Sequence, residues 1–155
     1  MNREVHYDFT RTWALEAGFS EVDAEAIASA NWACDRIHTG LAGKRYHWAA
    51  LGAQRLSRRR FGEAVERGDL VALGEALHTM QDAVGHGFWG HFYHWKGIDR
   101  WQHRGPRVRR RLETRSRAML EAFRLERPCP DAVASDASSL GSHAGTPMGD
   151  TCRMS

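Results

Sequence analysis

Apolar residues recur every three or four positions along most of this chain, which is the spacing of one face of an α-helix. No segment alternates apolar and polar residues over a length that would predict a β-strand. Ala, Leu, Glu and Arg, which favour helices, are abundant, and the first proline is Pro106. The pattern therefore predicts an all-α protein, a compact bundle of about five helices.

Capping residues and glycines set the expected limits of these helices. Ser20 is the expected N-cap of the second helix, because Asp23 follows it three residues later. Gly18 is the expected stop of the helix before it. The expected helical stretches are about Asp8–Ala17, a segment from Ser20 past Cys34, Tyr46–Arg60, Asp69–Val84 and Arg107–Leu125.

Glycine also marks the expected connections, since it tolerates turn conformations that other residues avoid. These connections are a loop at Gly40 and Gly43, the next one at Gly62 and Gly68, and a glycine- and aromatic-rich loop over Gly85–Gly97. After residue 126 the chain becomes rich in Pro, Ser, Ala, Asp and Gly, with few residues able to build a core. We expect one helical domain over residues 1–126 and an irregular, flexible or surface-draped tail over residues 127–155.

Length and composition are those of a single folded domain, with 155 residues of which 42% are hydrophobic and 26% charged. No apolar run reaches about 18 residues, so no membrane span is expected. The first ten residues lack an apolar signal segment, which favours a cytoplasmic location. A net charge of +3 is too small by itself to imply a nucleic-acid partner. The three cysteines, at positions 34, 129 and 152, are too irregularly spaced for a disulfide framework or a zinc knuckle.

Histidine is unusually frequent, with nine residues, and two of them belong to the densest chemical motif. His78, Asp82 and His86 are four residues apart, so on a helix they occupy one face. Two imidazoles and one carboxylate suit zinc, which takes such ligands at about 2.0–2.2 Å, and the two oxygens of Asp82 could bridge two metals. A His–Asp pair at this spacing can also be only a helical hydrogen bond, so both interpretations stay open.

Further metal donors must come from other helices. His6 precedes the first helix, Asp35 ends the second and His47 begins the third, with Asn31 expected on the surface one turn before Asp35. Each of these residues alone is more commonly a capping or surface residue. Together they place one donor near the end of each helix, which is how helical bundles build metal centres in their cores.

Two segments resemble a known family. The first consists of His6–Thr10, Ala17–Ser20 and Ala24–Ala28 with Asn31 and Asp35, and the second is Ala76–Phe88, which contains the three clustered residues of the central motif. They resemble an uncharacterised bacterial family related to the zinc-dependent phospholipases C. The larger superfamily also includes single-strand-specific nucleases of the fungal type. The resemblance covers roughly residues 6–91, a little over half of the chain.

This resemblance implies an all-helical fold around up to three zinc ions, and phosphoester hydrolysis by a metal-activated water. His78 and Asp82 match the paired ligands of the central motif. Asp35 resembles the acidic ligand of the earlier helix, and His47 resembles the histidine that follows it. These four residues form the first metal site that the resemblance implies.

The resemblance is less complete for a second and a third metal. His6 resembles an N-terminal histidine that shares a second metal with the bridging aspartate, and His86 resembles the first ligand of a third site. The secreted phospholipases begin with a processed tryptophan, whereas this chain begins with methionine. The third site needs a later histidine followed four residues on by Glu, and His91, His94 and His103 lack that glutamate. The chain is also shorter than a typical member.

The sequence thus predicts a hydrolase with one to three zinc ions, acting on a phosphoester or a related small-molecule substrate. Asp82 or Asp8 is the expected proton acceptor from a metal-bound water. Lys44 or Arg45 could stabilise the phosphoryl oxygens. Trp48 is one of the aromatic residues that could line a substrate pocket.

Other functions stay open on the sequence alone. The same scaffold could serve another reaction in biosynthesis. A metal saturated by protein ligands would make the chain a non-catalytic binding module with a structural zinc. Basic runs at Arg58–Arg60 and Arg107–Arg111 could bind nucleic acid, but the low net charge makes this partner the least favoured. Exposed apolar helix faces could also support a homo-oligomer.

Overall fold

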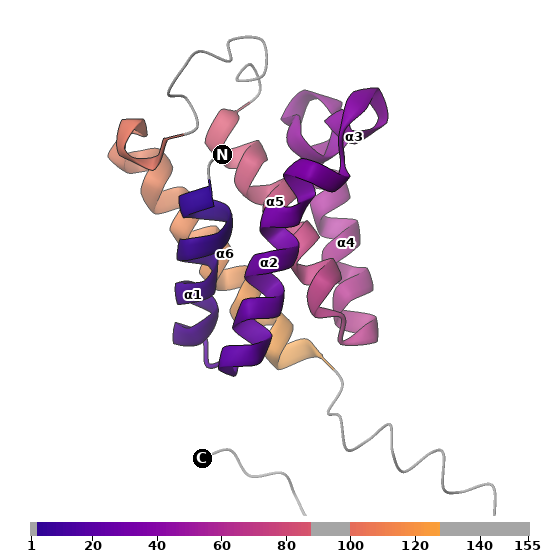
Figure 1. Ribbon diagram of the computed structural model, residues 1–155, viewed down its shortest axis with the longest axis vertical. Coiled ribbons are helices and arrows are strands. Elements are labelled where there is room, and N and C mark those ends of the chain that lie inside the picture. The colour runs from indigo at the N-terminus through magenta and orange to yellow at the C-terminus, as the bar shows by residue number, and fades with distance from the viewer. Residues whose placement is uncertain (1–2, 88–99, 128–155) are drawn as a thin grey trace, which may run out of the picture.

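Nine helical segments make up most of residues 3–87 and 100–127, the part of the chain that the computed structural model describes (Figure 1). Six of them are α-helices: α1 (Thr10–Glu16), α2 (Glu21–Ile37), α3 (Gly40–His47), α4 (Ala53–Arg67), α5 (Leu70–His86) and α6 (Pro106–Glu126). The others are a π-helical segment, η1 (Glu4–Phe9), and two 3₁₀ turns, η2 (Ala49–Leu51) and η3 (Trp101–His103). The described residues contain no strand, so the all-α prediction is confirmed.

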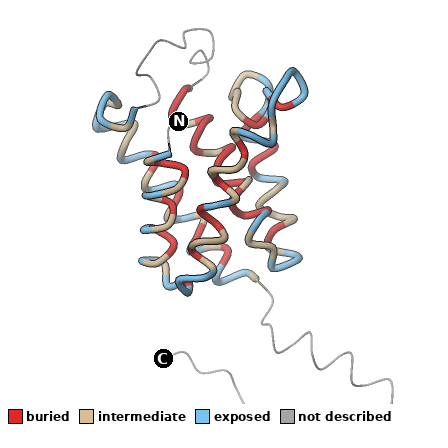
Figure 2. Tube along the Cα trace, in the orientation of Figure 1, coloured by how far each residue is buried: buried red, intermediate tan, exposed pale blue. Residues whose placement is uncertain are grey.

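Helix α5 runs through the middle of the bundle and packs against α2, α3, α4 and α6 (Figure 1). Twelve of its 17 residues are buried, and Figure 2 shows buried positions along its length. Asp69 caps the helix, because its carboxylate accepts hydrogen bonds from the backbone N–H groups of Val71 and Ala72. Since helices cover α5 on several sides, polar side chains in its C-terminal half are held inside the bundle.

Gly74 allows α2 and α5 to approach at backbone contact. A Cβ at this position would lie 2.6 Å from the carbonyl oxygen of Ile27 and 2.7 Å from the Cβ of Ala30. Both distances are shorter than packed atoms can tolerate, so the crossing requires glycine. The same close crossing brings the C-terminal turns of α2, with Asn31 and Asp35, towards the middle of α5.

The greatest departure from the expected helices lies in the stretch Tyr46–Arg60, which was predicted as one helix. In the structure α3 ends at His47 and α4 begins at Ala53. Trp48 is extended (φ −111°, ψ 114°) and Gly52 is left-handed (φ 88°), a conformation that glycine adopts at little cost. The prediction of one continuous helix is therefore wrong, and the break separates His47 from the helix that follows.

Four glycines that were expected in connections belong to helices instead. Gly40 and Gly43 lie in α3, and a Cβ on Gly43 would lie 2.3 Å from the carbonyl oxygen of His38. Packing rather than a turn therefore requires that glycine. Gly62 lies inside α4 and Gly85 inside α5, because an isolated glycine costs a helix only about 1 kcal/mol.

Other expected boundaries agree better with the structure. The Ser20 cap is confirmed, since the Asp23 N–H donates to its Oγ at 3.1 Å. The last helix extends one residue beyond each expected end, whereas the first helical segment begins at Glu4 rather than Asp8. Residues 88–97 of the expected loop, and the expected tail after Arg127, lie outside the described residues. No helix among the described residues is long and apolar enough to cross a membrane.

Candidate metal centre

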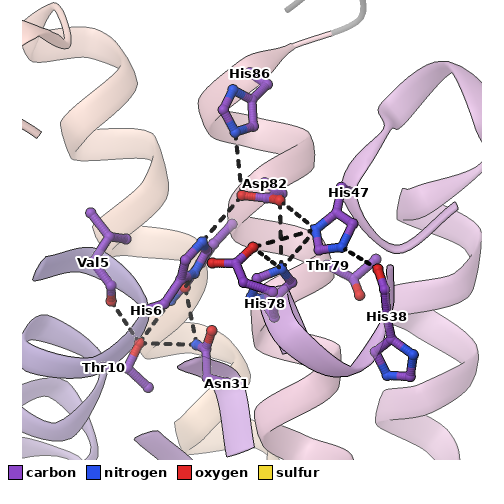
Figure 3. Close-up of polar contacts among 12 residues, drawn as sticks. Val5, His6, Thr10, Asn31, His38, His47, His78, Thr79, Asp82 and His86 are labelled. Atoms are coloured by element: carbon purple, nitrogen blue, oxygen red, sulfur yellow. Dashed lines mark hydrogen bonds and ion pairs between the residues drawn. The ribbon is translucent and has the colours of Figure 1, made fainter. Parts of the chain in front are cut away.

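The C-terminal half of α5 carries a cluster of acidic and imidazole groups (Figure 3). His78, Asp82 and His86 lie on successive turns, with side chains 0%, 3% and 2% exposed. Nε2 of His78 is 3.5 Å from Oδ2 of Asp82, and Nε2 of His86 is 3.4 Å from its Oδ1. The spacing therefore predicted correctly that these three side chains share one face.

His47 also approaches the Oδ2 oxygen, and Asp35 approaches the two imidazoles beside it. We call these four residues the Oδ2 group: Asp35, His47, His78 and Asp82. Nδ1 of His47 lies 3.0 Å from Oδ2 of Asp82 and 3.0 Å from Nε2 of His78. Oδ1 of Asp35 lies 3.8 Å from Nδ1 of His47 and 3.7 Å from Nε2 of His78. One potential ligand atom from each of the four residues lies within 4.8 Å of all the others.

The Oδ1 oxygen of Asp82 faces two histidines, and we call these three residues the Oδ1 group: His6, His86 and Asp82. Nε2 of His6 lies 3.2 Å from Oδ1, without the geometry of a hydrogen bond, and its side chain is completely buried. The resemblance implied separate metal sites for His6 and His86. In the structure both imidazoles instead face the same oxygen (Figure 3).

The orientation of the His47 ring favours a cation in the Oδ2 group. Its Nε2 lies 3.0 Å from the carbonyl oxygen of His38, which can only accept a hydrogen bond, so Nε2 carries a proton. In the neutral ring, Nδ1 then presents a lone pair to the Asp82 carboxylate and to His78. Such closely placed lone pairs need a proton or a metal ion between them.

Burial and charge act in opposite directions on the titratable groups. Burial alone would raise the pKa of Asp82, but nearby positive charge and the hydrogen bond with His47 hold that pKa well below its usual range. Burial, and then the charge of His6, lower the pKa of His78 well below that of a free histidine. Burial would also lower the pKa of His47, but the hydrogen bond and charge of Asp82 outweigh it and raise that pKa. Burial raises the pKa of Asp35, and the charge of Asp82 adds to the effect.

The Oδ2 group has the dimensions of a metal coordination shell. Ligand atoms about 2.1 Å from a tetrahedral ion lie about 3.4 Å from one another. Five of the six corresponding separations here run from 3.0 to 3.8 Å, and the sixth, between Asp35 and Asp82, is at most 4.8 Å. Two imidazoles with two carboxylates suit zinc, and suit iron or manganese as well. These residues therefore fit a divalent ion.

A cavity of about 360 Å³ reaches the Oδ2 group from solvent. Its lining includes two members of that group, whose side chains are 34% (Asp35) and 17% (His47) exposed. Among the described residues, the rest of the lining is made by His38, Thr39, Gly40, Lys44 and Trp48. A small molecule in this cavity would therefore lie against the ligands of the candidate metal.

The structure brings together all six residues that the sequence proposed as metal ligands, since each of the other five lies close to Asp82 or to its partners. It does not bring Asp8 to them. Asp8 is exposed, and its carboxylate lies 3.6 Å from the guanidinium of Arg3. The position of Asp8 therefore gives no support to its expected role as a proton acceptor.

The secondary candidates fall on different parts of the molecule. Lys44 and Trp48 line the cavity, whereas Arg45 is exposed and lies over the Tyr46 ring, 5.7 Å from its centre. His103 is exposed in η3, and the positions of His91 and His94 lie outside the described residues.

Sequence reasoning missed the polar residues that support the cluster. Asn31, expected on the surface, is completely buried, because the close approach of α2 and α5 covers it. Gln81 is also completely buried and accepts a hydrogen bond from the His6 ring. A glutamine in a helix whose other interior residues are mostly apolar was the available signal, and it lies next to Asp82 in the sequence.

The centre is thus defined by its geometry: two groups of donors on the two oxygens of one buried aspartate, with a cavity on one side. Comparisons of the chain with models of known protein families, with curated proteins and with solved structures found no match.

Proposed function

We propose that this protein is a metal-dependent hydrolase whose divalent ion, most simply zinc, is held by the Oδ2 group. One observation carries the proposal: four donors converge beside a cavity that is large enough for a small substrate. A buried donor set without access to solvent would favour a purely structural ion. A cavity without metal donors would favour simple binding.

Each residue of the Oδ2 group has a part in the proposal. His47 and His78 would supply imidazole ligands, and Asp35 and Asp82 would supply carboxylate ligands. A zinc ion at such a site lowers the pKa of its bound water to about 7 and so supplies hydroxide at neutral pH. Asp35, which borders the cavity, is the best-placed carboxylate to orient that water or to receive its proton.

The cavity supplies groups that suit a phosphoester. The ammonium group of Lys44 can attract the anionic oxygens of a phosphoryl group. Trp48 offers an aromatic surface to an apolar or planar part of the same molecule. A phosphoester of a small molecule is therefore the substrate class that we propose.

The same donors support a relationship to the zinc-dependent phospholipases C, which we propose on the convergence of the ligands that the resemblance implied. Asp35, His47, His78 and Asp82 meet in space although 47 positions separate the first from the last. Under this proposal the Oδ1 group holds a second ion. A cytoplasmic location and self-association stay predictions of the sequence.

A structural metal is the second candidate, and one observation favours it. Four protein ligands are enough to complete a tetrahedral zinc shell, which would leave no position for water. The scaffold would then be a binding module. Hydrolysis separates the two candidates, because only the first predicts it.

The test compares the wild-type protein with His78→Ala and with a matched control, His103→Ala, which changes an exposed histidine. Each protein is stripped with a chelator, reloaded with zinc, and analysed for bound metal and for hydrolysis of p-nitrophenyl phosphate and bis-p-nitrophenyl phosphate. We expect His78→Ala to lose both metal and hydrolysis, and His103→Ala to keep both. Undiminished zinc in His78→Ala would remove the metal assignment. Loss of zinc with no hydrolysis by any of the proteins would favour the structural metal.

A further inference from the structure

A network of buried polar side chains lies behind His6, on the side of its ring away from Asp82 (Figure 3). Its members are all completely buried and come from four helices: Thr10 of α1, Asn31 of α2, Gln81 of α5 and Ser116 of α6. Gln81 is at its centre, because it bonds to each of the others and to His6. Buried polar groups need such partners, and these partners fix each other's orientation.

The direction of each hydrogen bond follows from one backbone carbonyl. The Thr10 hydroxyl donates its proton to the carbonyl oxygen of Val5 at 2.9 Å, so it can only accept from its other neighbours. The amide nitrogens of Asn31 and Gln81 therefore donate to Thr10 Oγ1, at 3.1 and 3.0 Å. Gln81 Nε2 also donates to Ser116 Oγ at 3.1 Å.

The oxygen of Gln81 must then face the other way. Gln81 Oε1 accepts from Asn31 Nδ2 at 3.0 Å and lies 2.9 Å from Nδ1 of His6. Turning the Gln81 amide over would set its NH₂ group against the NH₂ group of Asn31. Since Oε1 can only accept, Nδ1 of His6 carries a proton.

From this geometry we propose that Gln81 is a positioning residue that fixes the tautomer of His6, so that Nε2 presents its lone pair to a metal ion on Oδ1 of Asp82. This inference rests on the proposed function for the presence of the ion. Nε2 lies 3.2 Å from Oδ1 without forming a hydrogen bond, so its lone pair is available to an ion bound at Asp82. Histidine ligands commonly donate their second ring N–H to an oxygen in this way.

On both sides of the centre a carbonyl oxygen accepts a hydrogen bond from the outer ring nitrogen of a histidine, but the two carbonyl groups differ in kind. The backbone carbonyl of His38 keeps the outer nitrogen of His47 protonated, and the side-chain carbonyl of Gln81 does so for His6. The contact through Gln81 also ties Ser116, and with it α6, to the candidate second metal position. Substitution of one side chain can therefore disturb the Oδ1 group without touching a ligand.

The test uses the full chain and the variant Gln81→Met, which keeps the volume of the side chain but removes its oxygen. Ser116→Ala is the matched control, because it removes one partner of Gln81 and leaves the contact with His6. The readouts are zinc affinity by competition with a chromogenic chelator, and ¹⁵N NMR of the histidine rings with His6 assigned from His6→Asn.

We expect wild-type His6 to be protonated at Nδ1 both without metal and with zinc bound. In Gln81→Met we expect the zinc held by the Oδ1 group to lose 10–100-fold in affinity, the range for loss of such a supporting hydrogen bond. The zinc held by the Oδ2 group should keep its wild-type affinity. In Ser116→Ala the affinity for either zinc ion should change by no more than about 3-fold.

Two results would overturn the inference: an unprotonated Nδ1 in wild-type His6, or wild-type affinity for two zinc ions in Gln81→Met. If Gln81→Met fails to fold, the spectrum of the wild-type protein still decides, since it requires no variant at position 81. A wild-type protein that binds no metal would overturn the proposed function, and a proton on Nδ1 in that protein would leave the tautomer assignment standing alone.

Discussion

The two oxygens of Asp82 face different surroundings. Oδ2 faces the imidazoles of His47 and His78. The Oδ2 group that they belong to borders a cavity through Asp35 and His47. Oδ1 faces two imidazoles, those of His6 and His86, whose side chains are 0% and 2% exposed. One carboxylate therefore connects a group of donors that borders a cavity with a group of donors that contacts a buried polar network. Under the proposed function, the first side carries the chemistry and the second fixes the geometry of the centre.

The largest expected effect is that of Asp82→Asn, which should weaken metal binding by the Oδ1 group and by the Oδ2 group at once. The amide keeps the shape of the side chain but loses the negative charge that both groups share. We expect metal affinity to fall more than 100-fold on both sides and hydrolysis to fall to background. Metal content after dialysis and initial rates of phosphoester hydrolysis measure this. An Asp82→Asn protein that retains one tightly bound ion would show that the two sides do not share the carboxylate.

Single ligand substitutions should separate the two sides. His47→Gln is expected to remove the ion next to the cavity, and to lower kcat by a factor on the order of 10²–10⁴. His6→Gln is expected to remove the second ion and to lower kcat by only about 10-fold, because it acts from the buried side. Metal stoichiometry with steady-state kinetics tests both variants. Equal losses of kcat would contradict the division of roles.

The approach of α2 to α5 offers a way to move Asp35 without changing any ligand. In Gly74→Ala the new Cβ meets backbone atoms of α2, so we expect a loss of about 1–3 kcal/mol in the free energy of unfolding. The affinity of the Oδ2 group for zinc should fall in Gly74→Ala as well. Gly62→Ala is the matched control, because nothing lies within 4 Å of a Cβ there, and it should be stabilising by about 0.4–1 kcal/mol. Urea unfolding of metal-free protein measures both, and a stable Gly74→Ala protein would mean that the helices can separate freely.

The smallest expected effect concerns the cavity alone. Lys44→Met should raise KM for a phosphomonoester about 3–10-fold and leave the metal content unchanged, since Lys44 lines the cavity but donates nothing to the ion. Arg45→Met is the control, because Arg45 is the exposed neighbour outside the cavity lining. Equal responses of the two variants would indicate a general effect of charge instead of a contact with substrate.

The sequence predicted the part of the centre that lies on one element. His78, Asp82 and His86 follow helical spacing, so their common face needed no tertiary information. The approach of His6, Asp35 and His47 was expected from their positions near the ends of predicted helices and from the resemblance, since nothing local determines how distant helices meet. Asp8 shows the limit of such reasoning, because it lies two residues after the buried candidate ligand His6 and still faces solvent.

The break between α3 and α4 was missed for a related reason. The residues from Tyr46 to Arg60 mostly favour helix, and Gly52 alone is a weak signal against it. Gln81 could not be recognised as a partner of His6, because the two positions are 75 residues apart and glutamine is not a usual metal ligand. Long-range hydrogen bonds of this kind become visible only when the helices are assembled.

The π-helical segment Glu4–Phe9 has a consequence for the evolution and engineering of the chain. A π-helical turn contains one residue more than the α-helical turn it replaces. Removing Tyr7, Asp8 or Phe9 would let the segment rewind as α-helix and rotate His6 by about 100° away from Asp82. Under the proposed function, a deletion in this stretch that spares every candidate ligand would therefore be as harmful as the replacement of one.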